Sequence, residues 1–429
     1  MESLEAAPAP QTSKARLPLL RPFGFRDFRL LFSGESVSVV GDQFHFVALA
    51  WLTLKLTGSG LALGSVLMMA AVPRAIFMLV GGALSDRLSP RSLMLYSNGV
   101  RALLVGGLAA LVLSGQVQLW HLYLLAAAFG VVDALFYPAV NAILPMLVDE
   151  PTLPPANALM QGSQQLAQLI GPALAGLLVA LVNTGPVFAF DAASFAFATV
   201  TLLFVLGGRR ASRGAEDEQQ AGLLGTIGAG FGYAWRDPAV RSLILLTAAF
   251  NFAFTGPLSV GIPFLAEHRL GGGSATFGIL LSAFGAGALI GAIGSGGISR
   301  VPRLGTVVLT IAVFLGVALA LIGVAPSVPV ALGLVAVLGL GAGFLNVHVT
   351  SWLQGRTAPE MRGRVMSMVM LGSVSLTPIS FAVAGVIVDV GAVDLMFAVA
   401  GLIIIAASLS GFVSGVPGQM TYATVEEEA

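Results

Sequence analysis

Several ionisable side chains stand inside long apolar runs of this sequence, where they could carry protons or bind a charged solute. Glu35, Asp42 and His45 share one run, and Asp133 lies in another. Glu35 and Asp42 are two helical turns apart and would face the same side of a helix. Proton-coupled transport needs a buried carboxylate that loads and releases a proton near neutral pH. We therefore take Asp42, Glu35 and Asp133 as the candidate proton-coupling residues.

Each of these charges also has a plainer interpretation. Asp133 could form a static ion pair with Arg74 or Arg101, which also lie in apolar runs. For Arg101 such structural pairing is favoured over contact with a substrate. For His45, one turn from Asp42, a simple hydrogen bond is at least as reasonable as a proton relay. Ionisable residues within a bilayer are costly and rare, so each one is a candidate functional residue in either case.

The composition requires lipid as the outer solvent. The 429 residues are 56% hydrophobic and 10% charged, with a mean hydropathy of +0.92, whereas soluble domains carry about 25% charged residues. A net charge of zero gives no reason to expect a nucleic-acid partner. There is no Cys, and the four His form no cluster with nucleophile or metal-ligand spacing, so the sequence argues against an enzyme and against a bound metal or other cofactor. A Gly-rich nucleotide loop is also missing, which argues against ATP as the energy source.

Twelve runs are long and apolar enough to span a bilayer. The long polar stretch 207–239 separates them into two groups of six. We therefore predict an all-α membrane protein with a tail over 1–29, a six-helix bundle over 30–206, a linker over 207–239, a second bundle over 240–415 and a tail over 416–429. The expected spans are 30–54, 60–84, 92–114, 119–146, 157–182, 186–206, 240–265, 275–298, 304–324, 328–353, 364–388 and 393–415.

Basic residues fix the expected orientation. Seventeen of the 21 lie in the N-terminal tail and the loops of one side, only Lys55 and Arg269 lie on the other, and Arg74 and Arg101 lie inside helices. Since basic loops stay on the cytoplasmic side, both termini are expected there. Asp191 and Asp389 then fall close to the outer interface, where we expect them to be solvated. The six-plus-six arrangement is typical of transporters whose two bundles rock around a central site.

Three motifs resemble those of the major facilitator superfamily. The segment Gly82-Ala-Leu-Ser-Asp86-Arg87-Leu-Ser-Pro-Arg91 is similar to the loop motif between helices 2 and 3, although Ser89 and Pro90 depart from it. The run Gly171-Pro172-Ala-Leu-Ala-Gly176 looks like the Gly-Pro motif of drug–proton antiporters. Gly41-Asp42 and its surroundings resemble the branch that contains enterobactin and macrolide exporters, which puts Asp42 first among the proton candidates.

This resemblance implies a major facilitator fold of two six-helix bundles with gating residues at defined places. Asp86 would face the start of helix 11 near Arg364 and hold the cytoplasmic side closed, since a carboxylate at a helix N-terminus is stabilised by the helix dipole. Arg87 and Arg91 would pair locally, with Asp149 or Glu150 as partners. Gly82 belongs to the same loop motif as Asp86 and is a further gating candidate. Three more gating candidates would give helix 5 a close, bendable contact with a helix of the other half: Gly171, Pro172 and Gly176.

The resemblance also implies that helices 1, 4, 7 and 10 line a central cavity. Polar and aromatic residues on these helices, together with a glutamine stripe on helix 5, would bind an amphipathic solute. Simple packing of the Phe cluster on helix 7 is the alternative. The substrate-binding candidates are Asp42, His45, Gln161, Gln165, Asn251, Phe254, Asn346 and His348, and Gln164 and Gln168 belong to the same stripe as Gln161 and Gln165.

The expected function is export of amphipathic or hydrophobic small molecules by proton antiport through alternating access. The resemblance implies a location in the bacterial inner membrane and a monomer. The proton gradient would be the driving force, and no cofactor is expected. Export or import of a specific metabolite, siderophore or metal ion stays open as an alternative. A membrane sensor is the alternative outside transport.

Overall fold

The structure is a computed structural model that describes residues 18–85, 89–207, 232, 235, 237–298, 301, 303–357 and 361–420. Within these residues, twelve segments are long and apolar enough to cross a membrane. The helices of the N-terminal half are η1 (Pro18–Gly24), α1 (Arg26–Thr57), α2 (Gly60–Ser85), α3 (Pro90–Leu113), α4 (Leu119–Ile143), η2 (Leu144–Met146), η3 (Glu150–Thr152), α5 (Leu153–Val182) and α6 (Thr184–Leu203).

The C-terminal half also has six spans among the described residues, and the seventh and eleventh spans of the chain are each divided into shorter helices. Its helices are α8 (Pro238–Gly256), η4 (Pro257–Gly261), α9 (Ile262–His268), α10 (Gly273–Gly296), α11 (Leu304–Ile322), α12 (Val328–Arg356), α13 (Arg362–Ser375), α14 (Thr377–Asp389), α15 (Val393–Val413) and α16 (Val416–Gln419).

Proline explains where the observed helices depart from the expected spans. The seventh span changes to a π-helical turn at Pro257 and continues to His268, and the eleventh is divided just before Pro378. The fourth span leaves the α-helix at Ile143, ahead of Pro145. Since proline has no N–H to donate, each of these sites loses a ladder hydrogen bond and the local helix geometry changes.

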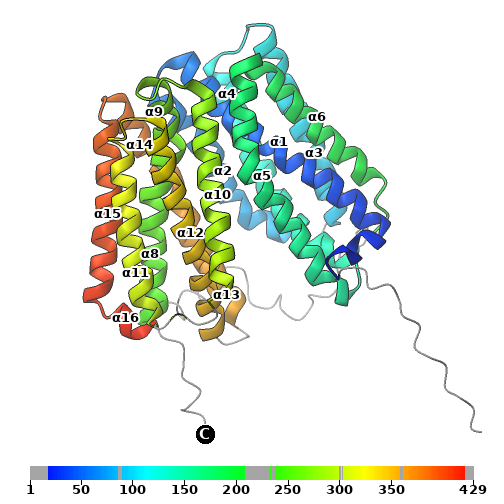
Figure 1. The fold of residues 1–429 in the computed structure, drawn as a ribbon. Helices are drawn as coiled ribbons and strands as arrows, with labels where there is room; N and C mark the ends of the chain where they lie inside the picture. The colour runs from blue at the N-terminus through cyan, green and yellow to red at the C-terminus, as the bar shows by residue number, and fades with distance from the viewer. Residues whose placement is uncertain are drawn as a thin grey trace, which may run out of the picture.

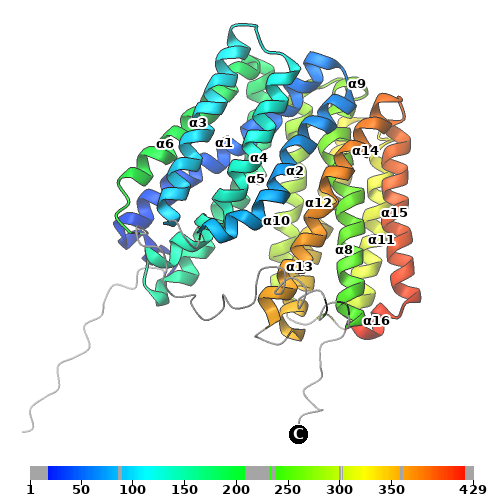
Figure 2. The ribbon, with the colours of Figure 1, turned by 180° about the vertical axis from the view of Figure 1, so that it is seen from behind.

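The two halves meet at one end of the molecule and diverge toward the other (Figures 1 and 2). They contact each other mainly through two helix pairs, α5 with α10 and α2 with α14. We call the end where α1 passes into α2 the closed end, and the end where α1 begins the open end. At 32 residues, α1 is about 48 Å long. A helix much longer than the hydrocarbon thickness can be accommodated by tilting, and α1 is tilted in Figure 1.

Glycine allows the halves to touch at the closed end. A Cβ added to Gly176 of α5 would lie 2.3 Å from the carbonyl oxygen of Ser274 and 3.0 Å from Cα of Gly278 in α10. A Cβ on Gly64 of α2 would lie 2.3 Å from the carbonyl oxygen of Phe381 in α14. Small residues therefore let the backbones of both helix pairs approach closely, as in other membrane helix interfaces.

Candidate substrate and proton site

A cavity of about 640 Å³ lies between the halves and is lined mostly by α1 to α5. Along α5 its lining runs from Asn157, near the open end, to Pro172 in the middle of the helix. The C-terminal half supplies a wall from α10, including Leu281 and Phe284. The closed end is sealed by the glycine contacts, so the cavity faces the open end. A polar pocket with aromatic walls is suited to amphipathic organic molecules.

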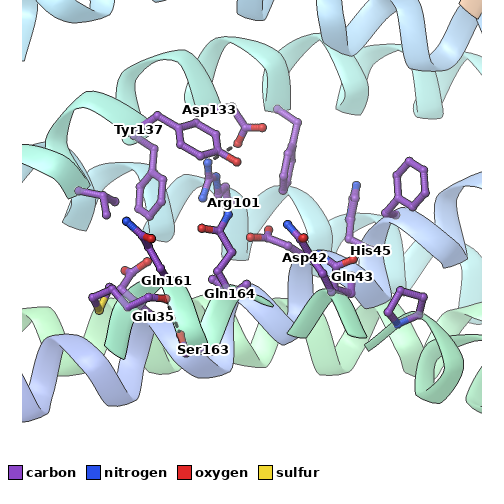
Figure 3. A pocket seen from close by; sticks show the side chains of 18 of the residues that line it. Glu35, Asp42, Gln43, His45, Arg101, Asp133, Tyr137, Gln161, Ser163 and Gln164 are labelled. Atoms are coloured by element: carbon purple, nitrogen blue, oxygen red, sulfur yellow. Dashed lines mark hydrogen bonds and ion pairs between the residues drawn. The ribbon is translucent and has the colours of Figure 1, made fainter. Parts of the chain in front are cut away.

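The three predicted carboxylates all line this cavity, in different surroundings (Figure 3). Glu35 is buried and accepts a hydrogen bond of 3.4 Å from Nδ2 of Asn98. Asp133 forms an ion pair with Arg101. Among the described residues, the carboxylate of Asp42 has no hydrogen-bond or ion-pair partner. Asp42 is therefore the carboxylate in the cavity most available to a proton or a positively charged solute.

Arg101 is the buried cation that balances these acids. Its side chain is 2% exposed, and its guanidinium pairs with Asp133 on α4. It also lies 4.2 Å from the ring centre of Phe136 and 5.5 Å from those of Phe129 and Phe195. Such an aromatic cage stabilises a desolvated guanidinium through cation–π interactions. Of the two partners considered for Asp133, the structure selects Arg101.

Arg74 has a different environment. It lines the cavity from α2, and its guanidinium lies 4.8 Å from the ring centre of Tyr137 on α4. Tyr137 was not among the candidates from sequence, nor were the cavity-lining Gln43, Asn141 and Ser163. A single polar residue in an apolar run does not indicate which face of the helix it occupies, so sequence offered little to find them.

The prediction that Asp191 is solvated was wrong. Asp191 on α6 is 0% exposed, and its Oδ2 lies 3.1 Å from Nδ1 of His45. Ser194 donates a hydrogen bond of 3.4 Å to the other carboxylate oxygen. A Cβ on Gly41 would lie 2.6 Å from that same oxygen, so glycine lets α1 pack directly over the pair.

His45 connects this buried pair to the cavity. Its ring lines the cavity and stacks on Phe129, with 4.6 Å between ring centres. The His45–Asp191 pair therefore reaches from the cavity wall into the interface between α1 and α6. By contrast, Asp389 is exposed at the end of α14, as expected.

The glutamine stripe on α5 is divided by its orientation. Gln161, Gln164 and Gln168 line the cavity, whereas Gln165 does not. The candidates of the C-terminal half also lie outside the lining. Asn251 donates to the carbonyl of Thr247 in its own helix.

Phe254 packs behind the cavity wall, since its ring centre lies 5.4 Å from that of the lining residue Phe284. Asn346 is exposed, and His348 is buried beside Phe344 with its Nε2 unpaired within the described chain. Within the described residues, the C-terminal half lines the cavity with α10, which is the eighth span. The expectation that the seventh and tenth spans line the cavity was therefore wrong for this structure.

The predicted gating residues fall into three groups. Gly176 contacts α10 of the other half as expected, and the carbonyl of Pro172 lies 2.1 Å from a Cβ added to Gly278. Gly171 instead packs on Gln43 of α1 in its own half, so the expectation was wrong for this residue. Helix 5 turns its small residues toward two different neighbours.

The third group surrounds the loop after α2. Gly82 is part of α2, and Arg91 donates to the carbonyls of Leu202 and Leu203 at the end of α6, at 3.0 and 2.8 Å. A cation at a helix C-terminus is favoured by the helix dipole. Asp86, Arg87 and the side chain of Arg364 lie outside the described residues, so the cytoplasmic contact stays a prediction.

A sequence profile of the Major Facilitator Superfamily matches residues 31–379, most of the chain. The chain belongs to the major facilitator superfamily. Solved structures agree with this fold: a bacterial homologue of the iron transporter ferroportin in an inward-facing state superposes with a TM-score of 0.71 at 18% identity, over 91% of this chain and 98% of that one.

Relatives of this major facilitator protein include named drug exporters. The multidrug efflux pump Tap of Mycolicibacterium fortuitum is 27% identical over 367 residues, which cover 83% of this chain and 88% of that protein. Macrolide efflux protein A of Streptococcus pyogenes is 24% identical over 387 residues, covering 88% of this chain and 93% of that protein. The protein is thus a multi-pass membrane transporter rather than an enzyme.

Proposed function

We propose that this transporter exports amphipathic small molecules from the cytoplasm in exchange for protons. The observation that carries the proposal is Asp42, which lies on the wall of a cavity of about 640 Å³ between the two halves and has no hydrogen-bond or ion-pair partner for its carboxylate among the described residues. The similarity to multidrug and macrolide efflux proteins supports export and the class of substrate. The basic residues of the loops support cytoplasmic termini in a bacterial inner membrane, with the cavity facing the cytoplasm in this structure.

In this mechanism the buried charges have separate tasks. Arg101 and Asp133 stay paired and keep the cavity wall near neutrality. Asp42 binds a proton in one half of the cycle and releases it when the substrate enters from the cytoplasm. Phe129, Phe136 and Tyr137 provide apolar and aromatic surface for the substrate body. One chain provides all of these groups, so a monomer suffices.

Transport into vesicles tests the proposal. Purified protein is reconstituted in liposomes, a pH gradient is imposed in either direction, and movement of ethidium, an amphipathic cation, is followed by fluorescence. We expect dye to move against the proton flux and to stop when nigericin collapses the gradient. Dye movement that ignores the gradient would contradict proton coupling. Failure to move any dye, in vesicles that retain folded protein, would point to a narrow metabolite, siderophore or metal substrate.

A further inference from the structure

An acid from the C-terminal half caps a helix of the N-terminal half at the closed end. Asp389, the last residue of α14, accepts a hydrogen bond of 2.5 Å from the backbone N–H of Gly60 and one of 2.7 Å from the hydroxyl of Ser59. Gly60 is the first residue of the 26-residue helix α2. The N-terminus of a helix carries unsatisfied N–H groups and a partial positive charge, so a carboxylate there is stabilised by both.

The backbones beneath this cap are already in contact. A Cβ on Gly60 would lie 2.3 Å from Cγ1 of Val388, and one on Gly385 would lie 2.7 Å from the carbonyl oxygen of Gly60. This close approach holds the first turn of α2 at the distance where the Asp389 carboxylate reaches it. When the halves separate at this end, the Gly60 N–H loses its partner in α14.

A second polar contact joins the halves at the same end. Nζ of Lys55, in the last turn of α1, lies 2.5 Å from Oε1 of Glu267 on α9. The ammonium also lies 5.3 Å from the ring centre of Trp51. The side chain of Lys55 is 54% exposed, so this pair alone is worth little, because water screens it. Asp389 is exposed as well, but its carboxylate accepts two hydrogen bonds across the halves, one of them from a backbone N–H, so we take the cap as the main contact.

A nearby ion pair provides a natural comparison. Arg269 at the end of α9 pairs with Asp394 in the first turn of α15, and both residues belong to the C-terminal half. Like Asp389, Asp394 is an exposed aspartate at the closed end. Unlike Asp389, it has no partner in the N-terminal half among the described residues, so its removal leaves the contact between the halves intact.

We propose that Asp389 is a gating residue: its cap on α2, assisted by Lys55–Glu267, latches the closed end while the cavity faces the other side. The latch rests on the proposed alternation between two facing states, but not on which solute or ion is carried. It must break each time the cavity opens at this end. Its strength therefore sets the ratio between the two facing states of the empty transporter.

Spin-label distances test the latch without any transport assay. The chain has no Cys, so labelled double-cysteine variants need no background changes. The pair Gln116→Cys and Val390→Cys reports the closed end across the halves, and Glu150→Cys with Ser414→Cys reports the open end. All four sites are exposed. Each reporter is combined with Asp389→Ala, with Glu267→Gln, and with the matched control Asp394→Ala.

We expect Asp389→Ala to raise the ratio of the population open at the closed end by about 2- to 5-fold, the range for an exposed charge at a helix N-terminus. The open-end distance should shorten in step, Glu267→Gln should have a smaller effect, and Asp394→Ala should match the parent. Distances in Asp389→Ala that equal those of the parent and of Asp394→Ala would overturn the latch. Because the readout is conformational, it distinguishes failure of the latch from failure of proton-coupled export.

Discussion

At the scale of single residues, the transporter balances buried acids with one buried arginine. Arg101 is enclosed by Phe129, Phe136 and Phe195 and pairs with Asp133, so it cannot swing out to follow a substrate. Asp42 has no such partner among the described residues. This difference is why we give Arg101 and Asp133 a structural task and Asp42 the proton.

Removing the buried arginine should destabilise the fold. Arg101→Leu leaves Asp133 without its counter-ion, and breaking such a pair costs about 3–5 kcal/mol. We therefore expect a markedly lower melting temperature in detergent for Arg101→Leu, with partial recovery in Arg101→Leu/Asp133→Asn, where the unpaired charge is gone. Arg74→Gln, which removes an arginine without breaking a described ion pair, is the control. Equal melting temperatures for Arg101→Leu and the double variant would argue against the pair.

The buried pair of His45 and Asp191 should likewise matter more for stability than for coupling. Asp191→Ala leaves Nδ1 of His45 without its partner in a fully buried interface, at a cost of about 1–3 kcal/mol. We expect a lower melting temperature, while dye transport per folded molecule stays coupled to the pH gradient. Loss of coupling with an unchanged melting temperature would instead put Asp191 on the proton path.

Asp191 also shows where sequence reasoning ends. Its distance from the predicted end of the sixth run suggested a solvated position, but depth in the membrane does not determine which neighbour a residue faces. α6 is apolar on most of its faces, so hydrophobic periodicity did not identify its packed side. Asp42 and Glu35 were easier to place, because two acids at a seven-residue spacing define a face by themselves.

At the scale of helices, the contact between α5 and α10 depends on glycine. The neighbours of Gly176 are backbone atoms of Ser274 and Gly278, which cannot rotate away from an added methyl group. Gly176→Ala should therefore push the halves apart at the closed end and lower both thermal stability and transport. Gly162→Ala on the same helix is the control, since nothing lies within 4 Å of its added Cβ, and alanine favours a helix by about 1 kcal/mol over glycine.

Equal stability and transport in Gly176→Ala and Gly162→Ala would contradict this account of the α5–α10 contact.

The helices themselves were predictable, because a run of about 20 apolar residues has few alternatives in a bilayer. Their interruptions were harder. Pro257 and Pro378 stand within apolar runs that length alone reads as continuous, and Gly171 faces α1 while Gly176, five residues on, faces α10.

At the scale of the whole molecule, the basic residues of the loops predict how the protein is oriented in the membrane. Gln116 lies at the closed end and Ser414 at the open end, both exposed. In intact cells, we expect a membrane-impermeant maleimide to label Gln116→Cys but to reach Ser414→Cys only after the membrane is permeabilised. Labelling of Ser414→Cys in intact cells would contradict the predicted topology and, with it, the proposed direction of export.

The facing state could not be read from the sequence. An alternating-access transporter must populate two arrangements that differ by a few kcal/mol, so one sequence encodes both. The contacts that select the present arrangement, such as Gly64 against Phe381 and Asp389 against Gly60, join residues more than 300 positions apart. Composition and motifs gave the two bundles, whereas the arrangement of the bundles depends on such long-range contacts.

The central claim, that substrate and proton share Asp42, is tested most directly by counting protons released when the dye binds. Purified protein in weakly buffered detergent solution is titrated with ethidium, and a pH indicator and dye binding are followed together. By linkage, a shared carboxylate predicts release of about one proton per bound dye in the parent and in Asp394→Asn. Asp42→Asn should release none at saturating dye. Equal proton release from Asp42→Asn and the parent, or dye binding to the parent without proton release, would contradict the account.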